Sequence, residues 1–192
     1  MSKGRVEAFT DAVVAIIMTI MVLELKAPEG DTFSDLIPLQ STFLAYVLSF
    51  FLIGVTWNNH HHMFQLADKI NGRVLIVNTG FMFVMSFMPF ATSWVGEHYN
   101  KFAPAFLYGL VFLLFNIMYV VLTNELLRAN GPESNLAKAI KNDNKTWVSL
   151  SFSLIGLMSV FIKPELVLIF CLIVPSIWFI PNRLIENFYK DK

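Results

Sequence analysis

The first residues to consider for chemistry are three adjacent histidines, His60, His61 and His62, because histidine binds metals and titrates near neutral pH. Consecutive residues of a helix point about 100° apart, so the three rings cannot bind one ion unless the helix unwinds. A membrane di-iron centre would also need more ligands than the four histidines of this chain. We therefore expect no metal centre, and interpret His60 or His61 as a hydrogen-bond partner of the first helix. A role in pH sensing stays open.

Three charged residues, Arg5, Glu7 and Asp11, lie in the apolar segment near the N-terminus. Charges inside hydrocarbon are costly and usually face protein, a partner or water. On a helix Glu7 and Asp11 are neighbours, whereas Arg5 and Asp11 point to opposite sides and cannot neutralise each other. Arg5 and Glu7 can instead reach the headgroup level. The deeper Asp11 indicates a polar network with other helices.

The same segment carries an apolar stripe at spacings of three and four residues: Arg5, Phe9, Ala12, Ile16, Thr19/Ile20 and Leu23. Ordinary helix packing is the commoner meaning of such a stripe. The alternative is a pore lining, in which apolar rings close the path and threonine oxygens contact a partly dehydrated cation. The pattern alone does not choose between the two.

The composition is that of a membrane protein. Of the 192 residues, 56% are hydrophobic and 15% charged, with a mean hydropathy of +0.60, whereas soluble domains carry about 25% charged residues. Soluble enzymes and disordered chains are therefore excluded. Fourteen basic residues equal fourteen acidic ones, which leaves no basic excess for nucleic acid. The single cysteine, Cys171, excludes a disulfide framework.

Long stretches without charge predict the membrane spans, since a crossing helix needs about 20 mostly apolar residues. A cleaved signal peptide is the competing interpretation of the first segment, but an Ala-x-Ala-like cleavage site is missing. We predict an all-α membrane protein of one domain, residues 1–192. The six expected helices cover approximately residues 5–25, 39–62, 73–95, 103–127, 146–162 and 165–181.

The distribution of basic residues predicts the orientation. With a cytoplasmic N-terminus, eleven lysines and arginines lie inside and three, Lys26, Lys101 and Lys163, lie outside. This bias is typical of an even number of spans with both ends in the cytoplasm. We expect a multi-pass protein of the cell inner (plasma) membrane.

Other polar and breaking residues lie within or between these helices. Asn78 and Asn116 indicate hydrogen bonds between helices. Pro89 and Pro175 should kink or end their helices. The first outside loop, residues 27–38, is acidic; it would concentrate cations, although an ordinary solvated loop has the same pattern.

The N-terminal motif resembles a family signature. The run from Arg5 to Ile16, with Phe9, Thr10 and Asp11, resembles the Arg-x-x-x-Phe-Ser-Asp-x-x-x-Ala-Ile signature of the transmembrane protein 175 family. That family comprises potassium channels of endolysosomes, with bacterial relatives. Further matches over the first half of the chain are Trp57-x-x-His60-His61, Phe64, Asn78 and Met88-Pro89-Phe90. Thr10 replaces the usual serine and keeps the hydroxyl.

The resemblance implies a bacterial single-repeat channel that assembles as a homotetramer around a central pore, lined by the first helix and without a re-entrant filter loop. Carried onto this sequence, Ile16 would form the main apolar constriction, followed by Ile20 and Leu23, and Thr19 would contribute to selectivity. The expected signature network that holds the pore helix comprises Arg5, Phe9, Thr10, Asp11, Trp57, His60, His61 and Asn78.

The sequence thus predicts a potassium-preferring passive cation channel rather than an enzyme. Expected partners are further copies of the chain, the lipid bilayer and permeant monovalent cations, with no nucleic acid; no cofactor is expected besides potassium ions in the pore. Asp11, Glu7 and the histidines leave open a proton-coupled secondary transporter or a proton-conducting channel. A membrane enzyme or a purely structural helix bundle is the third alternative.

Overall fold

The computed structural model describes residues 3–140 and 144–178, and this part of the chain is helical without strands. Its elements are α1 (Lys3–Leu23), the 3-10 helix η1 (Phe33–Leu39), α2 (Gln40–Leu66), α3 (Gly72–Met85), α4 (Met88–Glu97), α5 (Phe102–Asn130), α6 (Asn135–Ile140), α7 (Lys145–Ser159) and α8 (Leu166–Trp178).

Four helical segments of the described chain are long and apolar enough to cross a membrane: Lys3–Leu23, Phe33–Leu66, Gly72–Glu97 and Phe102–Asn130. The helix predicted over 39–62 continues to Leu66. α7 has 15 residues and α8 has 13, fewer than the roughly 20 of a full crossing. Residues 179–181 of the last predicted helix lie outside the described residues.

The two prolines within predicted helices act differently. The helix predicted over 73–95 is two elements, because α3 ends at Met85 and Pro89 lies in the first turn of α4. A proline is tolerated there, since the first turn has no intrahelical partner for its missing N–H. Pro175, in contrast, lies inside α8, which continues past it to Trp178.

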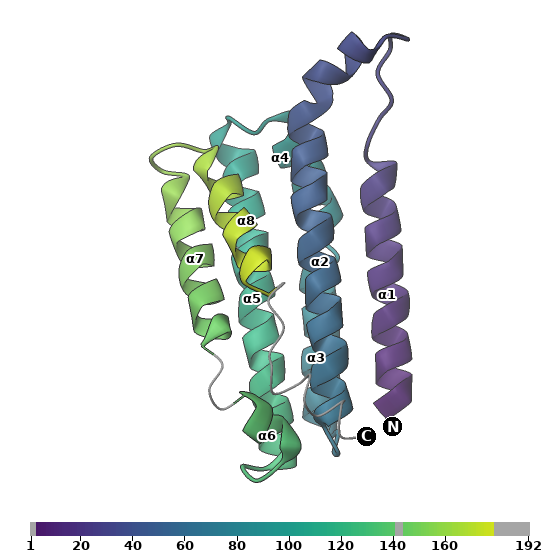
Figure 1. Cartoon of the computed structure of the whole chain (residues 1–192), viewed down its shortest axis with the longest axis vertical. Helices are drawn as coiled ribbons and strands as arrows, with labels where there is room; N and C mark the ends of the chain where they lie inside the picture. Colours follow the sequence, from purple (N-terminus) through teal and green to yellow (C-terminus); the bar gives the residue numbers. More distant parts are fainter. Residues whose placement is uncertain (1–2, 141–143, 179–192) are drawn as a thin grey trace.

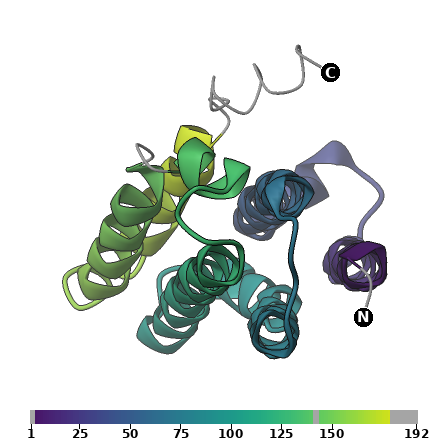
Figure 2. The ribbon, with the colours of Figure 1, turned by 90° about the horizontal axis from the view of Figure 1, so that it is seen from below.

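The long helices run side by side, and α1 lies at the edge of the bundle (Figures 1 and 2). α5 packs against α3, α4 and α7, while α2 packs against α4 and α8. α1 packs against α2, α3 and α4. The face of α1 that these three helices leave uncovered is therefore available to lipid, water or another protein chain.

A buried hydroxyl cluster joins three helices. Thr92 of α4 donates to Ser49 of α2 at 2.8 Å, and Ser49 lies 3.0 Å from the hydroxyl of Tyr108 of α5. All three side chains are buried. Hydrogen bonds between apolar helices fix their register, since these hydroxyls have no water to bind instead.

Glycine allows α4 to approach α2 closely. A Cβ added at Gly96 would lie 2.7 Å from the Cα of Thr42, and Ser41 donates to the Gly96 carbonyl at 2.8 Å. A side chain at this position would force the two backbones apart. Small residues at such crossings are typical of membrane helix packing.

We predict that Gly96→Ala destabilises the protein by about 1–3 kcal/mol, because overpacking at a rigid backbone contact displaces neighbouring helices. The measurement is the thermal unfolding midpoint of the purified protein. Gly72→Ala is the matched control, since a Cβ there meets nothing within 4 Å. Equal midpoints for the two variants would contradict this close packing.

Candidate functional site

The two faces of α1 differ in burial. Val6, Thr10, Val14, Ile17 and Met21 are buried against the bundle. The other face leaves Ile16 59%, Ile20 41% and Leu23 74% exposed. The apolar stripe identified in the sequence therefore contributes little to packing within one chain.

Thr19 interrupts the stripe with a hydroxyl. Its Oγ1 donates to the carbonyl of Ala15 at 2.7 Å and is exposed. Because the hydroxyl hydrogen is donated within the helix, the oxygen keeps lone pairs that can accept a hydrogen bond or contact a cation. The exposed Thr19 oxygen therefore lies between the exposed apolar side chains of Ile16, Ile20 and Leu23.

The buried face of α1 is attached through a chain of three polar side chains. Asn78 of α3 donates its Nδ2 hydrogen to Thr10 Oγ1 at 3.0 Å. His60 Nε2 of α2 lies 2.9 Å from Asn78 Oδ1. Since the amide oxygen only accepts, His60 donates from Nε2. All three side chains are buried, and the His60 ring stacks on Phe64 with 4.2 Å between centroids.

A second group of contacts lies on the exposed side of the first. Trp57 donates its indole N–H to Asp11 Oδ1 at 2.8 Å. The Trp57 ring stacks on His61 with centroids 6.3 Å apart, and His61 Nδ1 lies 3.8 Å from Glu7 Oε1. Gln65 Nε2 is 2.6 Å from His61 Nε2. α1 is thus attached to α2 by Asp11 and Glu7 together.

Two basic residues at the start of α1 have different surroundings. Lys3 donates to the carbonyls of Gln65 and Ala67 at 3.0 and 3.2 Å, at the end of α2. Arg5 is exposed, and no hydrogen bond or ion pair of its guanidinium is found among residues 3–140 and 144–178. Sequence reasoning missed the Lys3 contacts, because nothing local identifies the carbonyls it meets.

The structure therefore brings most of the expected network together. Thr10, Asp11, Trp57, His60, His61 and Asn78 form its two groups of contacts, whereas Arg5 and Phe9 are exposed outside them. In the described part of the chain, no group of three or more His, Cys, Asp or Glu side chains could hold a metal ion.

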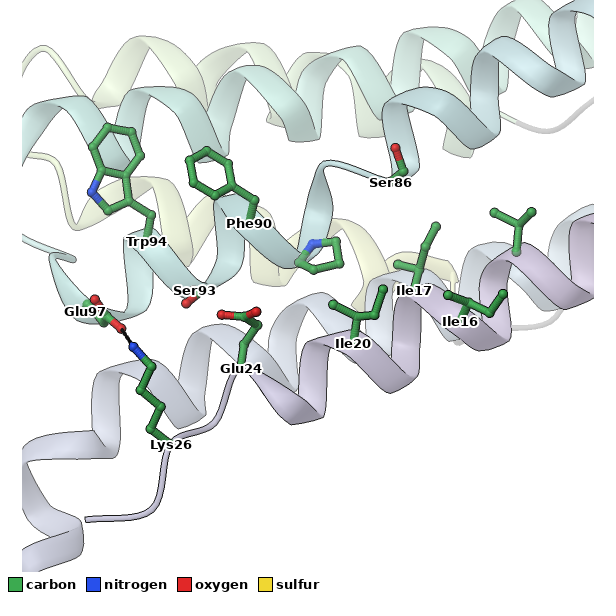
Figure 3. Close-up of a pocket in the computed structure, with 12 residues that line it drawn as sticks. Ile16, Ile17, Ile20, Glu24, Lys26, Ser86, Phe90, Ser93, Trp94 and Glu97 are labelled. Atoms are coloured by element: carbon green, nitrogen blue, oxygen red, sulfur yellow. Dashed lines mark ion pairs between the residues drawn. The ribbon is translucent and has the colours of Figure 1, made fainter. Parts of the chain in front are cut away.

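A cavity of about 670 Å³ lies between parts of α1 and α4 (Figure 3). Ile16 and Ile20 line one side, and Phe90 and Trp94 line the other. The cavity reaches the C-terminal end of α1, where Glu24 is part of the lining. We call it the α1–α4 cavity.

A family model described as endosomal/lysosomal potassium channel TMEM175 matches residues 5–89. The chain is 42% identical over 191 residues to a potassium channel of Chryseobacterium sp. (strain P1-3), with all of both chains covered. It is 27% identical to the endosomal/lysosomal proton channel TMEM175 of Danio rerio, over 52% of this chain and 20% of that protein.

The structure is also similar to a solved one. A crystal structure of a lysosomal potassium-selective channel TMEM175 homolog from Chamaesiphon minutus superposes with a TM-score of 0.81 at 26% identity, covering 92% of this chain and 96% of that one. Two of these findings establish the family: the Chryseobacterium relative matches over its full length, and the family model matches residues 5–89. The chain belongs to the TMEM175 family of membrane channels, whose members let ions pass through a membrane.

Proposed function

We propose that this chain forms a potassium-preferring passive cation channel as a homotetramer, with α1 of each copy lining a central pore. The observation that carries the proposal is the exposed stripe of Ile16, Ile20 and Leu23 on a helix whose opposite face is firmly attached. In this arrangement Ile16 is the main constriction, Ile20 and Leu23 extend the apolar path, and Thr19 supplies oxygens for selectivity.

Polar groups on α1 favour a neighbouring copy or water over lipid at its outward side. Arg5 and Thr19 lie on the stripe and are exposed within one chain, and charged or polar groups facing hydrocarbon are costly. The α1–α4 cavity lies beside the same stripe. A second copy packed there would cover both the stripe's flank and the cavity.

The proposed topology has six spans with both ends in the cytoplasm of a bacterium, within one domain of the inner (plasma) membrane. It adds α7 and α8 to the four long segments. The positions of eleven of fourteen basic residues support it. The animal relatives named as proton channels are the reason to test proton conduction beside potassium.

We propose that the network of Thr10, Asp11, Trp57, His60, His61 and Asn78 positions α1 rather than contacting ions. Asn78 is hydrogen-bonded to both Thr10 and His60, and Trp57 is hydrogen-bonded to Asp11 and stacks on His61, so together they hold the helix at a fixed rotation about its axis. Arg5 and Phe9, outside these contacts, are available to a neighbouring copy.

We predict that Ile16→Asn and Leu23→Asn each raise potassium flux from proteoliposomes severalfold, because a polar ring stays hydrated where an apolar one excludes water. Ile162→Asn is the control, since Ile162 is an exposed apolar residue just beyond α7. An unchanged potassium flux in both Ile16→Asn and Leu23→Asn would overturn the proposed constriction.

We predict that Thr19→Val lowers the potassium-to-sodium permeability ratio, because it replaces the exposed oxygen by a methyl group of similar size. Reversal potentials between potassium and sodium solutions measure this ratio. Thr79→Val on α3 is the matched control: its hydroxyl is also exposed and donates to the carbonyl four residues earlier, at 3.0 Å.

The same recordings under a proton gradient separate the alternatives. A passive potassium channel reverses near the potassium equilibrium potential whatever the pH difference. A reversal potential that follows the proton gradient would favour proton conduction instead, and an unchanged ratio in Thr19→Val would remove Thr19 from selectivity.

We predict that Asn78→Leu destabilises the protein by about 1–3 kcal/mol, because it leaves the buried His60 donor without an acceptor. The unfolding midpoint and the potassium flux should both change, since α1 loses its connection to α2 and α3. Asn116→Leu is the control, as Asn116 donates only within α5, to Phe112 at 2.9 Å. If Asn116→Leu changes the unfolding midpoint and the potassium flux as much as Asn78→Leu does, the positioning role of Asn78 is contradicted.

A further inference from the structure

A second cavity, of about 700 Å³, lies where the chain leaves α1. Residues 24–28 form one side, and η1 with the start of α2 forms another. We call it the α1-exit cavity. Its walls are mostly apolar: Leu25, Pro28, Leu36, Leu39 and Phe43. A volume of this size is typical of pockets that hold small organic molecules.

The charged residues of this cavity are unbalanced. Glu24, Lys26 and Glu97 all line it, and the same three residues also line the α1–α4 cavity, so the two cavities adjoin there. Lys26 Nζ lies 3.7 Å from Glu97 Oε1, so the one lysine of the lining is paired with the carboxylate of Glu97 on α4. No hydrogen bond or ion pair of the Glu24 side chain is found among residues 3–140 and 144–178. Figure 3 shows its carboxylate beside the Lys26–Glu97 pair. Glu24 therefore offers a carboxylate without a cationic partner at the edge of an apolar space.

The surrounding chain adds negative charge. Residues 24–35 contain four carboxylates, Glu24, Glu29, Asp31 and Asp35, against Lys26 alone. Asp35 accepts hydrogen bonds from the Thr32 N–H at 2.9 Å and the Thr32 hydroxyl at 2.6 Å, so it is held at the start of η1. Such an excess of negative charge raises the local concentration of cations.

We propose that the α1-exit cavity binds an organic cation whose ammonium group pairs with Glu24 while its apolar body lies against Leu36, Leu39 and Phe43. A bare metal ion fits less well, because it needs several oxygen ligands and these walls are mainly hydrocarbon. A neutral apolar molecule would leave the carboxylate unpaired in a drier environment. Phe43 adds an aromatic ring, and such rings attract ammonium groups.

Such a ligand would connect the end of α1 to the beginning of α2, immediately after Leu23. The binding step itself does not depend on ion conduction, so it is measured without current. Retained binding of the ligand without potassium flux would count against the proposed channel function alone, and flux without binding would count against this site alone.

The test is isothermal titration of the full chain in nanodiscs of zwitterionic lipid, with benzyltriethylammonium as the probe. Tetramethylammonium carries the charge without a large apolar body, and benzyl alcohol carries an aromatic body without the charge. We expect the probe to bind at least about ten-fold more tightly than either, because charge and apolar contact both contribute. Tetramethylammonium binding as tightly as the probe would overturn the role of the apolar walls.

Two variants locate the site. Glu24→Gln should weaken probe binding by about ten-fold or more, the loss expected for a charge-assisted contact. Glu29→Gln removes the same charge from the same segment without lining the cavity, so it should leave binding nearly unchanged. Equal weakening by both would show that the probe responds only to general negative charge.

Leu36→Trp fills the cavity without removing a charge. Leu36 is about half exposed, so the larger ring is tolerated by the fold, and probe binding should be lost or strongly reduced. Binding that persists in Leu36→Trp would overturn the proposal, since it would place the ammonium elsewhere, for example along the proposed pore.

Discussion

The structure depends on how α1 is held at its buried face. One amide, Asn78, donates to Thr10 on α1 and accepts from His60 on α2, so a single buried residue of α3 fixes the relation of three helices. In an apolar surrounding these groups have no competing water, and each needs the others. Rotating α1 by one residue would break this chain. The rotation that satisfies it is also the one that turns Ile16, Ile20 and Leu23 away from the bundle.

This constraint leaves one face of the first helix free for the contacts with other copies that the proposed tetramer requires. Its buried face is attached within one chain through Thr10, and beside that face the exposed Asp11 accepts a hydrogen bond from Trp57. Its outward face is incomplete, being apolar and flanked by the α1–α4 cavity. Helix packing alone would bury a stripe of this kind. An attached helix that leaves the stripe exposed is what the proposed pore requires, and membership of a channel family makes a pore the natural use for it.

Local rules in the sequence account for much of this. Charge-free stretches predicted the long helices, and Pro89 predicted the break before α4. Asp11 and the histidines indicated a polar network at one end of the first helix, and the family resemblance added Thr10 to it. Its pairings, such as Asn78 with both Thr10 and His60, depend on which helices become neighbours, and a single sequence does not encode that locally. For the same reason the sequence did not predict the contacts that Lys3 of α1 makes with the end of α2. Nor did it predict the α1-exit cavity, which arises where η1 passes beside residues 24–28.

The central claim is that Ile16 faces an aqueous path shared by several copies. The direct measurement is modification of Ile16→Cys by a charged, water-soluble thiol reagent during current recording, in a Cys171→Ser background; Cys171 itself is buried. The account predicts rapid modification with a large drop in current, slowed by potassium at high concentration. An Ile16→Cys thiol that stays unmodified while potassium currents flow would contradict it.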